Sequence, residues 1–163
     1  MTSKKGVAVT IGILVAITLA SFIVWFIPST NQSIPISDYK NNLDGIKNIH
    51  QAIKESVNED FQRMLDNEIS PDEFNERAKV ASSQINSQII KIMQSNPPEE
   101  WKKSYQSYQK ALRTFNSYIR ETQAVSSAVQ DEESGNIEKN LEKLNQLKEE
   151  SRELVKKSDS SRP

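Results

Sequence analysis

Residues with catalytic potential are few in this chain, and they are not grouped. His50 is the single histidine, and the chain has no cysteine. A carboxylate-bridged metal site in a helical bundle needs a Glu-x-x-His pair on each of two helices, whereas Lys47 stands three residues before His50. The serine motif of hydrolases and the glycine-rich loop that binds phosphate are both absent from the sequence. We therefore expect a non-enzymatic protein with no catalytic residue, no metal and no cofactor.

The position of His50 within its segment suggests a structural role. It lies between Ile46 and Ile53 in a stripe of apolar residues at helical spacing. This position predicts a histidine at the edge of a packed core, where water or a neighbouring side chain satisfies it. A pH-sensing role at that edge is the functional alternative.

Aromatic residues recur at helical spacing in one segment and are the second feature that could do chemistry. On a helix of a bundle, such a stripe can line a ligand pocket or a groove for a partner. The same spacing is also typical of core packing, with the tyrosine hydroxyls at the rim. Core packing is the simpler interpretation, and Tyr118 lies off the seam, which favours exposure. The candidate binding residues are Trp101, Tyr105, Tyr108 and Tyr118.

The elements that position these residues are predicted to be helices, because apolar residues step by three and four between three breaks. Ser70 and Pro71 begin a segment with the signature of a capped helix start. Residues 96–98 contain two prolines, and residues 131–136 contain a glycine that permits a turn. No segment alternates with a period of two, so we expect no strands.

The fold class is therefore all-α, with an antiparallel four-helix bundle over residues 37–157. Ser151 interrupts the apolar stripe of the last segment, so a three-helix core with a loosely packed fourth helix is the alternative. The many charges of that segment predict a solvated face, or else a coiled-coil-like partner surface. Residues 158–163 are predicted to be disordered.

Residues 6–27 carry no charge and predict a transmembrane helix. As a helix they would span roughly 33 Å, enough to cross a hydrocarbon core of about 30 Å. The run is longer than the apolar part of a signal peptide and ends in bulky residues, which favours an uncleaved anchor. Residues 1–5 would then form a short tail, and residues 28–36 a linker to the bundle.

Charge predicts the orientation of this anchor. Lys4 and Lys5 precede it, and the next basic residue is Lys40, so the amino terminus is expected in the cytoplasm and the bundle outside the cell membrane. All 22 acidic residues and all but two of the 21 basic residues follow the anchor, which gives no basic excess for binding nucleic acid. Small residues on one face of the anchor predict a homodimer, because they let two helices approach closely: Ala8, Gly12, Ala16 and Ala20.

Two resemblances extend these expectations. Lys4-Lys5-Gly6 before an apolar run resembles the class III signal of archaeal pilin precursors, which are cut after the glycine, and this implies a pilin-like surface subunit. The run lacks the glutamate that bacterial pilins carry five residues past the cut, and Pro28 would break the helix that a pilin extends. The predicted bundle resembles the four-helix sensing domains of chemoreceptors, which implies a ligand-binding bundle that works with a membrane partner.

The leading functional hypothesis is a single-pass membrane protein whose bundle contacts an unknown protein partner at the cell surface. The alternative is a bundle that binds a small molecule or peptide through its aromatic helix. A binding domain should contain a cavity among Trp101, Tyr105 and Tyr108, whereas an interaction module should have a filled core and an exposed apolar strip.

Overall fold

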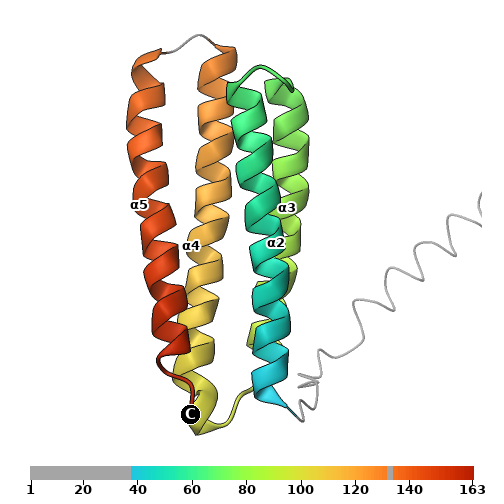
Figure 1. Cartoon of the computed structure of the whole chain (residues 1–163), viewed down its shortest axis with the longest axis vertical. Helices are drawn as coiled ribbons and strands as arrows, with labels where there is room; N and C mark the ends of the chain where they lie inside the picture. The colour runs from blue at the N-terminus through green and yellow to red at the C-terminus, as the bar shows by residue number, and fades with distance from the viewer. Residues whose placement is uncertain (1–37, 132–133) are drawn as a thin grey trace, which may run out of the picture. The chain divides into compact units, whose positions relative to one another are not determined.

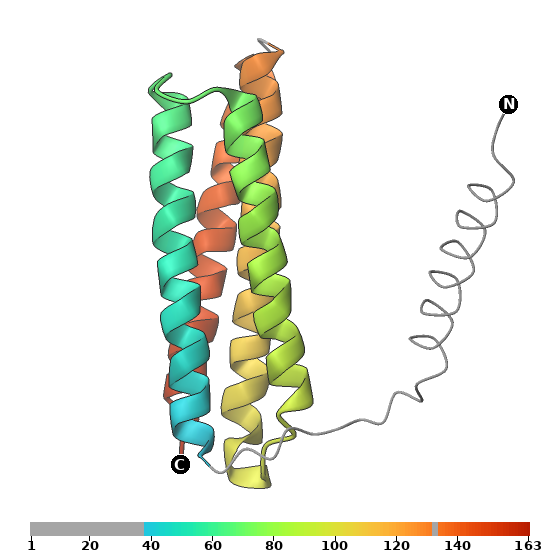
Figure 2. The ribbon, with the colours of Figure 1, turned by 90° about the vertical axis from the view of Figure 1, so that its right-hand side faces the viewer.

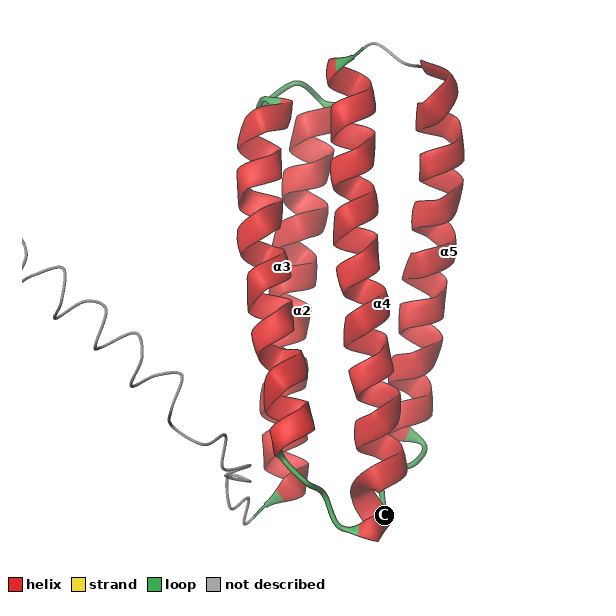
Figure 3. Ribbon diagram, turned by 180° about the vertical axis from the view of Figure 1, so that it is seen from behind, coloured by secondary structure: helices red, strands yellow, loops and turns green. Residues whose placement is uncertain are grey.

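The computed structural model describes residues 38–131 and 134–163, which form four helices and no strand. The helices are α2 (Tyr39–Leu65), α3 (Pro71–Gln94), α4 (Glu99–Gln130) and α5 (Ser134–Asp159) (Figure 1). Consecutive helices run in opposite directions and are joined by short loops (Figure 3). The all-α prediction is confirmed. The predicted anchor over 6–27, with its small-residue stripe, lies outside the described residues, and none of the helices described could span a membrane.

The helix starts follow from local capping. The side chain of Ser70 accepts a hydrogen bond of 3.1 Å from the backbone amide of Glu73, and Pro71 occupies the first turn of α3, as predicted. Asp38 caps α2 in the same way, with its Oδ1 atom 2.9 Å from the amide of Asn41. These caps satisfy amides that a helix cannot pair internally. Helix α5 begins at Ser134, inside the third predicted break.

Helix α4 is the centre of the bundle. It packs against α2, α3 and α5, whereas α5 has close backbone contact with α4 alone. Figure 2 shows α2 and α3 in front of α4 and α5, so that α2 and α5 lie on the same side of the bundle. The largest fully buried side chains come from α2, α3 and α4 and include Leu43, Phe74, Ile85, Tyr105, Leu112 and Ile119. The core is thus formed mainly by three helices, with α5 added along α4.

The alternative of a loosely packed fourth helix rested on Ser151, but this serine is part of the contact with α4. Ser151 is buried, and its hydroxyl donates a hydrogen bond of 3.1 Å to the carbonyl of Ala111 on α4. One heptad later, the hydroxyl of Ser158 lies 3.1 Å from that of Ser104, and both side chains are fully buried. Small residues let two helix axes approach closely. The serines are therefore part of the contact between α4 and α5, which a count of apolar residues does not reveal.

The prediction of a disordered tail from residue 158 is wrong. Helix α5 continues to Asp159, whose carboxylate accepts a hydrogen bond of 2.5 Å from Lys47 on α2. Beyond the helix, Arg162 forms an ion pair of 2.7 Å with Asp44. That guanidinium, through a hydrogen bond, lowers the pKa of the Asp44 carboxyl. The terminal position of this segment predicted disorder, but these long-range pairs hold residues 159–162 beside the first turns of α2 (Figure 2).

Candidate ligand pocket between α2 and α5

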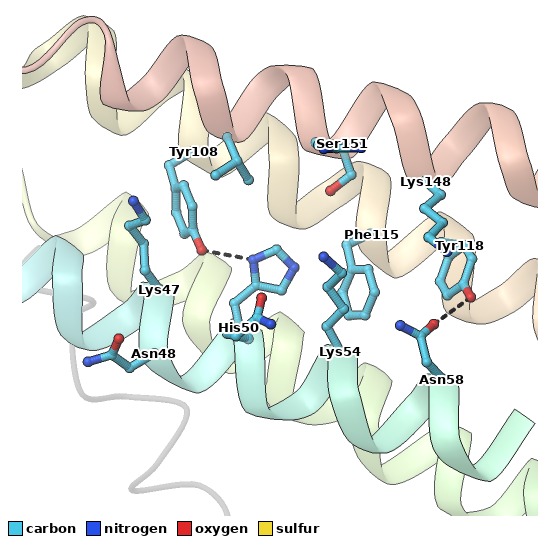
Figure 4. Close-up of a pocket in the computed structure, with 13 residues that line it drawn as sticks. Lys47, Asn48, His50, Lys54, Asn58, Tyr108, Phe115, Tyr118, Lys148 and Ser151 are labelled. Atoms are coloured by element: carbon cyan, nitrogen blue, oxygen red, sulfur yellow. Dashed lines mark hydrogen bonds between the residues drawn. The ribbon is translucent and has the colours of Figure 1, made fainter.

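A pocket of about 310 Å³ lies between α2 and α5. Its floor is supplied by α4, and its walls come from the two outer helices (Figure 4). The pocket exists because α2 and α5 both pack on α4 without close backbone contact with each other. The residues that determine its chemistry are His50, Lys54, Tyr108, Phe115, Tyr118 and Lys148.

His50 lies deep in this pocket, with only 5% of its surface exposed. Its Nδ1 atom is 2.8 Å from the hydroxyl oxygen of Tyr108, and its ring centre is 4.7 Å from that of Phe115. The Tyr108 hydroxyl has no other hydrogen-bond partner among the described residues, so we assign it as the donor to Nδ1. The neutral imidazole then carries its proton on Nε2.

The Nε2 atom of His50 is buried and has no hydrogen-bond partner in the described part of the chain. In Figure 4 it points away from Tyr108 and into the space between Ser151, Lys54 and Phe115. Leaving a buried polar group unpaired costs about 1–3 kcal/mol. Such a group is usually explained by a water or a ligand. Nε2 therefore marks the position at which a polar atom of a ligand would bind.

Burial controls the protonation of both residues in this pair. It lowers the pKa of His50 from 6.5 to about 4, and the nearby charge of Lys54 acts in the same direction. Burial also raises the pKa of Tyr108 well above its usual range. At neutral pH the imidazole and the phenol are therefore both uncharged, and the deepest part of the pocket carries no charge of its own.

The other end of the floor is formed by Phe115 and Tyr118, whose rings are stacked with centres 5.6 Å apart. The hydroxyl of Tyr118 donates a hydrogen bond of 2.7 Å to Oδ1 of Asn58. This bond fixes the amide of Asn58 so that its NH₂ group turns toward the pocket (Figure 4). The floor is therefore aromatic. Two hydrogen-bond donors of α2 lie beside it, Nε2 of His50 and the NH₂ group of Asn58.

The rim of the pocket is basic. Lys47, Lys54, Lys148 and Arg152 line it, and no carboxylate does so among the described residues. Lys47 is paired with Asp159, and Arg152 lies 3.7 Å from Glu149. Lys54 and Lys148 form no ion pair within residues 38–131 and 134–163. They approach the pocket from opposite walls, from α2 and from α5 (Figure 4).

Another hollow, of about 340 Å³, lies between α2 and α3. It contains Asp60 and Arg77, which already form an ion pair of 2.7 Å. No group of acidic residues or histidines that could hold a metal occurs in the parts of the chain that the structure describes. The pocket at His50 differs from the hollow between α2 and α3 in its buried, unpartnered imidazole nitrogen and in two lysines that form no ion pair within the described residues.

Two of the four candidate aromatic residues belong to this pocket. Tyr108 and Tyr118 line it, and Tyr118 is buried rather than exposed as its position off the seam had favoured. Tyr105 lies in the core, and Trp101 packs on it edge-to-face with ring centres 6.3 Å apart. Neither Trp101 nor Tyr105 lines the pocket.

The sequence interpretation missed the part played by α2. The apolar spacing places His50 at the edge of the core and gives no reason to select Lys54 or Asn58. A signal was present, because polar residues at 47, 51, 54 and 58 step by four and three beside the apolar stripe. A polar stripe of this kind is normally a solvated face. It becomes the wall of a pocket only because α5 lies opposite, which the sequence of α2 alone does not predict.

The buried imidazole predicts a loss of stability on mild acidification. Below pH 6.5 the unfolded chain takes up a proton on His50, but the folded protein does so only near pH 4. The unfolded state then binds more protons, so stability falls as the pH falls. Between pH 7 and pH 5 the free energy of unfolding should drop by about 2 kcal/mol more for the wild type than for His50→Gln. Urea titrations at the two pH values measure this difference, and equal pH dependence of the two proteins would contradict it.

Taken together, the pocket has the features of a binding site. It combines an aromatic floor, fixed hydrogen-bond donors and two cations that form no ion pair within the described residues. Comparisons of the chain with protein-family models, with curated proteins and with solved structures find no match.

Proposed function

We propose that this protein is a non-enzymatic helical bundle that binds a small molecule in the pocket between α2 and α5. The observation that carries the proposal is the buried Nε2 atom of His50, which faces the pocket without a partner. A volume of about 310 Å³ is at the lower end of the range for small-molecule sites. An apolar, aromatic lining with a few convergent polar groups is also typical of such sites.

This proposal is preferred over a bundle that only contacts another protein. A protein-interaction module should expose a continuous apolar strip. The exposed large apolar residues of the described bundle are instead spread over three helices: Ile49, Val80, Ile90, Met93 and Leu141. The cavity beside Tyr108 favours a ligand.

We further propose that the bundle is held at the cell membrane by a single helix over residues 6–27, with the amino terminus in the cytoplasm. The support is the uncharged run and the two lysines before it. A bundle held outside the membrane in this way would pass ligand binding to a membrane partner. Pairing of anchors through the stripe from Ala8 to Ala20 would place two such bundles side by side.

Filling the pocket tests the proposed function. Gln51→Trp and Val155→Trp add an indole from opposite walls, whereas Ala52→Trp adds one on an exposed position next to the pocket. A library of small molecules is screened against each full-length protein in mild detergent by saturation-transfer NMR. We expect compounds that bind the wild type and Ala52→Trp but neither pocket-filled variant, provided that all variants unfold cooperatively. If no compound distinguishes the filled variants from the control, the pocket is not a binding site.

A further inference from the structure

We propose that the ligand of this pocket is a small amphipathic carboxylate. Its carboxylate would lie between His50, Lys54 and Lys148, and its apolar body would lie on the ring of Phe115. This inference rests on the proposed function and adds the chemical class of the ligand. Three observations support it: the character of the hydrogen-bonding groups, the balance of charge and the shape of the floor.

The polar groups that converge on the pocket are mostly donors. With the Tyr108 hydroxyl donating to Nδ1, the imidazole of His50 offers the N–H at Nε2. Asn58 uses its oxygen to accept from Tyr118, which leaves its NH₂ group free to donate. The ammonium groups of Lys54 and Lys148 can only donate. A ligand that meets these groups must supply acceptors, and an ionised carboxylate has two oxygens and no donor.

The charge balance of the pocket favours a negative group. Asp159 neutralises Lys47, and Glu149 lies beside Arg152, but no carboxylate lines the pocket to balance Lys54 and Lys148. Lys54 is only partly exposed. Its positive charge adds to the effect of burial in lowering the pKa of the His50 imidazole. Opposite charges attract more strongly in such a partly buried site than in water. A carboxylate would gain this attraction together with charge-assisted hydrogen bonds.

The floor determines the rest of the ligand. The ring of Phe115, with Tyr108 and Tyr118 on either side of it, forms an aromatic surface between the two walls (Figure 4). Val155 adds aliphatic carbon from α5. Two packed aromatic rings are stabilised by more than the apolar area that they bury. A volume of about 310 Å³ leaves room for one ring with a short chain and not for a lipid or a folded peptide.

The test uses two probes of the same shape, 3-phenylpropionate and its neutral amide 3-phenylpropionamide. Each is titrated into the full-length protein in mild detergent at pH 7.5, and affinities are measured by ligand-observed NMR. Hydrogen bonds to a charged group are roughly twice as strong as those between neutral groups, so we expect the acid to bind at least about tenfold more tightly than the amide.

Variants then assign this preference to the pocket. The double variant Lys54→Gln/Lys148→Gln should lose at least about tenfold in affinity for the acid while its affinity for the amide stays the same. The control Lys91→Gln/Lys110→Gln removes the same charge from exposed positions on α3 and α4 and should bind both probes like the wild type. His50→Phe keeps an aromatic ring but removes the donor, and it should also weaken binding of the acid.

The outcomes separate this inference from the proposed function. If the acid fails to bind, or binds no more tightly than the amide, the carboxylate assignment is wrong. Equal loss of acid binding in both lysine double variants would also overturn it, because only the net charge would then matter. The proposed function would still hold if any other compound binds the wild type and Ala52→Trp but not Gln51→Trp. If no compound behaves in this way, the proposed function fails as well.

Discussion

Replacement of Tyr105 by alanine should destabilise the bundle by about 4 kcal/mol. The side chain is almost completely buried, and its ring packs edge-to-face on Tyr39 with centres 6.0 Å apart. Its hydroxyl donates a hydrogen bond of 2.8 Å to the carbonyl of Tyr39 and accepts one of 3.1 Å from Asn42. The substitution therefore leaves a large cavity between α2 and α4 and removes both hydrogen bonds of the hydroxyl. Urea unfolding followed by circular dichroism measures the loss.

Two variants show where this loss comes from. Tyr105→Phe keeps the ring and should cost only about 1–2 kcal/mol, because only the hydrogen bonds of the hydroxyl disappear. Trp101→Ala should cost less than Tyr105→Ala, because Trp101 is only partly buried and packs at the edge of the core. A larger loss for Trp101→Ala would place the centre of the core one turn earlier and would contradict the burial of Tyr105.

The elements of the fold could be predicted because their signals are local. The cap at Ser70, the prolines at 97 and 98 and the stripe that contains Leu112 and Ile119 each act within a few residues of chain. Apolar spacing of three and four places such residues on one face, and that face must be buried. For this reason the number of described helices and most of their boundaries agree with the sequence-based expectation.

The pocket could not be predicted because it depends on the spacing between helices that are distant in sequence. The stripe of α2 indicates that His50 faces inward, but not whether a neighbour covers it. That depends on how far α5 lies from α2, which is set by contacts such as Ser104 with Ser158 and by the ion pair of Asp44 with Arg162. Serine and arginine near a chain end are common in solvated segments. Their pairing becomes visible only in the folded structure.

The contact between α4 and α5 leads to the second large expected effect. Ser104→Leu should destabilise the protein by about 3 kcal/mol, although it adds an apolar residue to a buried face. The site is fully buried against Ser158, so there is no free volume for the larger side chain. The substitution also leaves the hydroxyl of Ser158 without its partner, which adds to the cost. Ser117→Leu makes the same change at an exposed position of α4 and should alter stability by less than about 0.5 kcal/mol.

Hydrogen exchange can show whether the loss has the proposed cause. If small residues are required for close packing of α5 on α4, Ser104→Leu should displace the last turn of α5 and expose the amides of residues 156–162 to faster exchange. The ion pairs of Asp159 with Lys47 and of Arg162 with Asp44 would break with it, and the wall of the pocket at Val155 would move. A Ser104→Leu protein as stable as the wild type, with unchanged protection of these amides, would mean that α5 is not held by its serines. The width of the pocket would then have to be set by other contacts of α5.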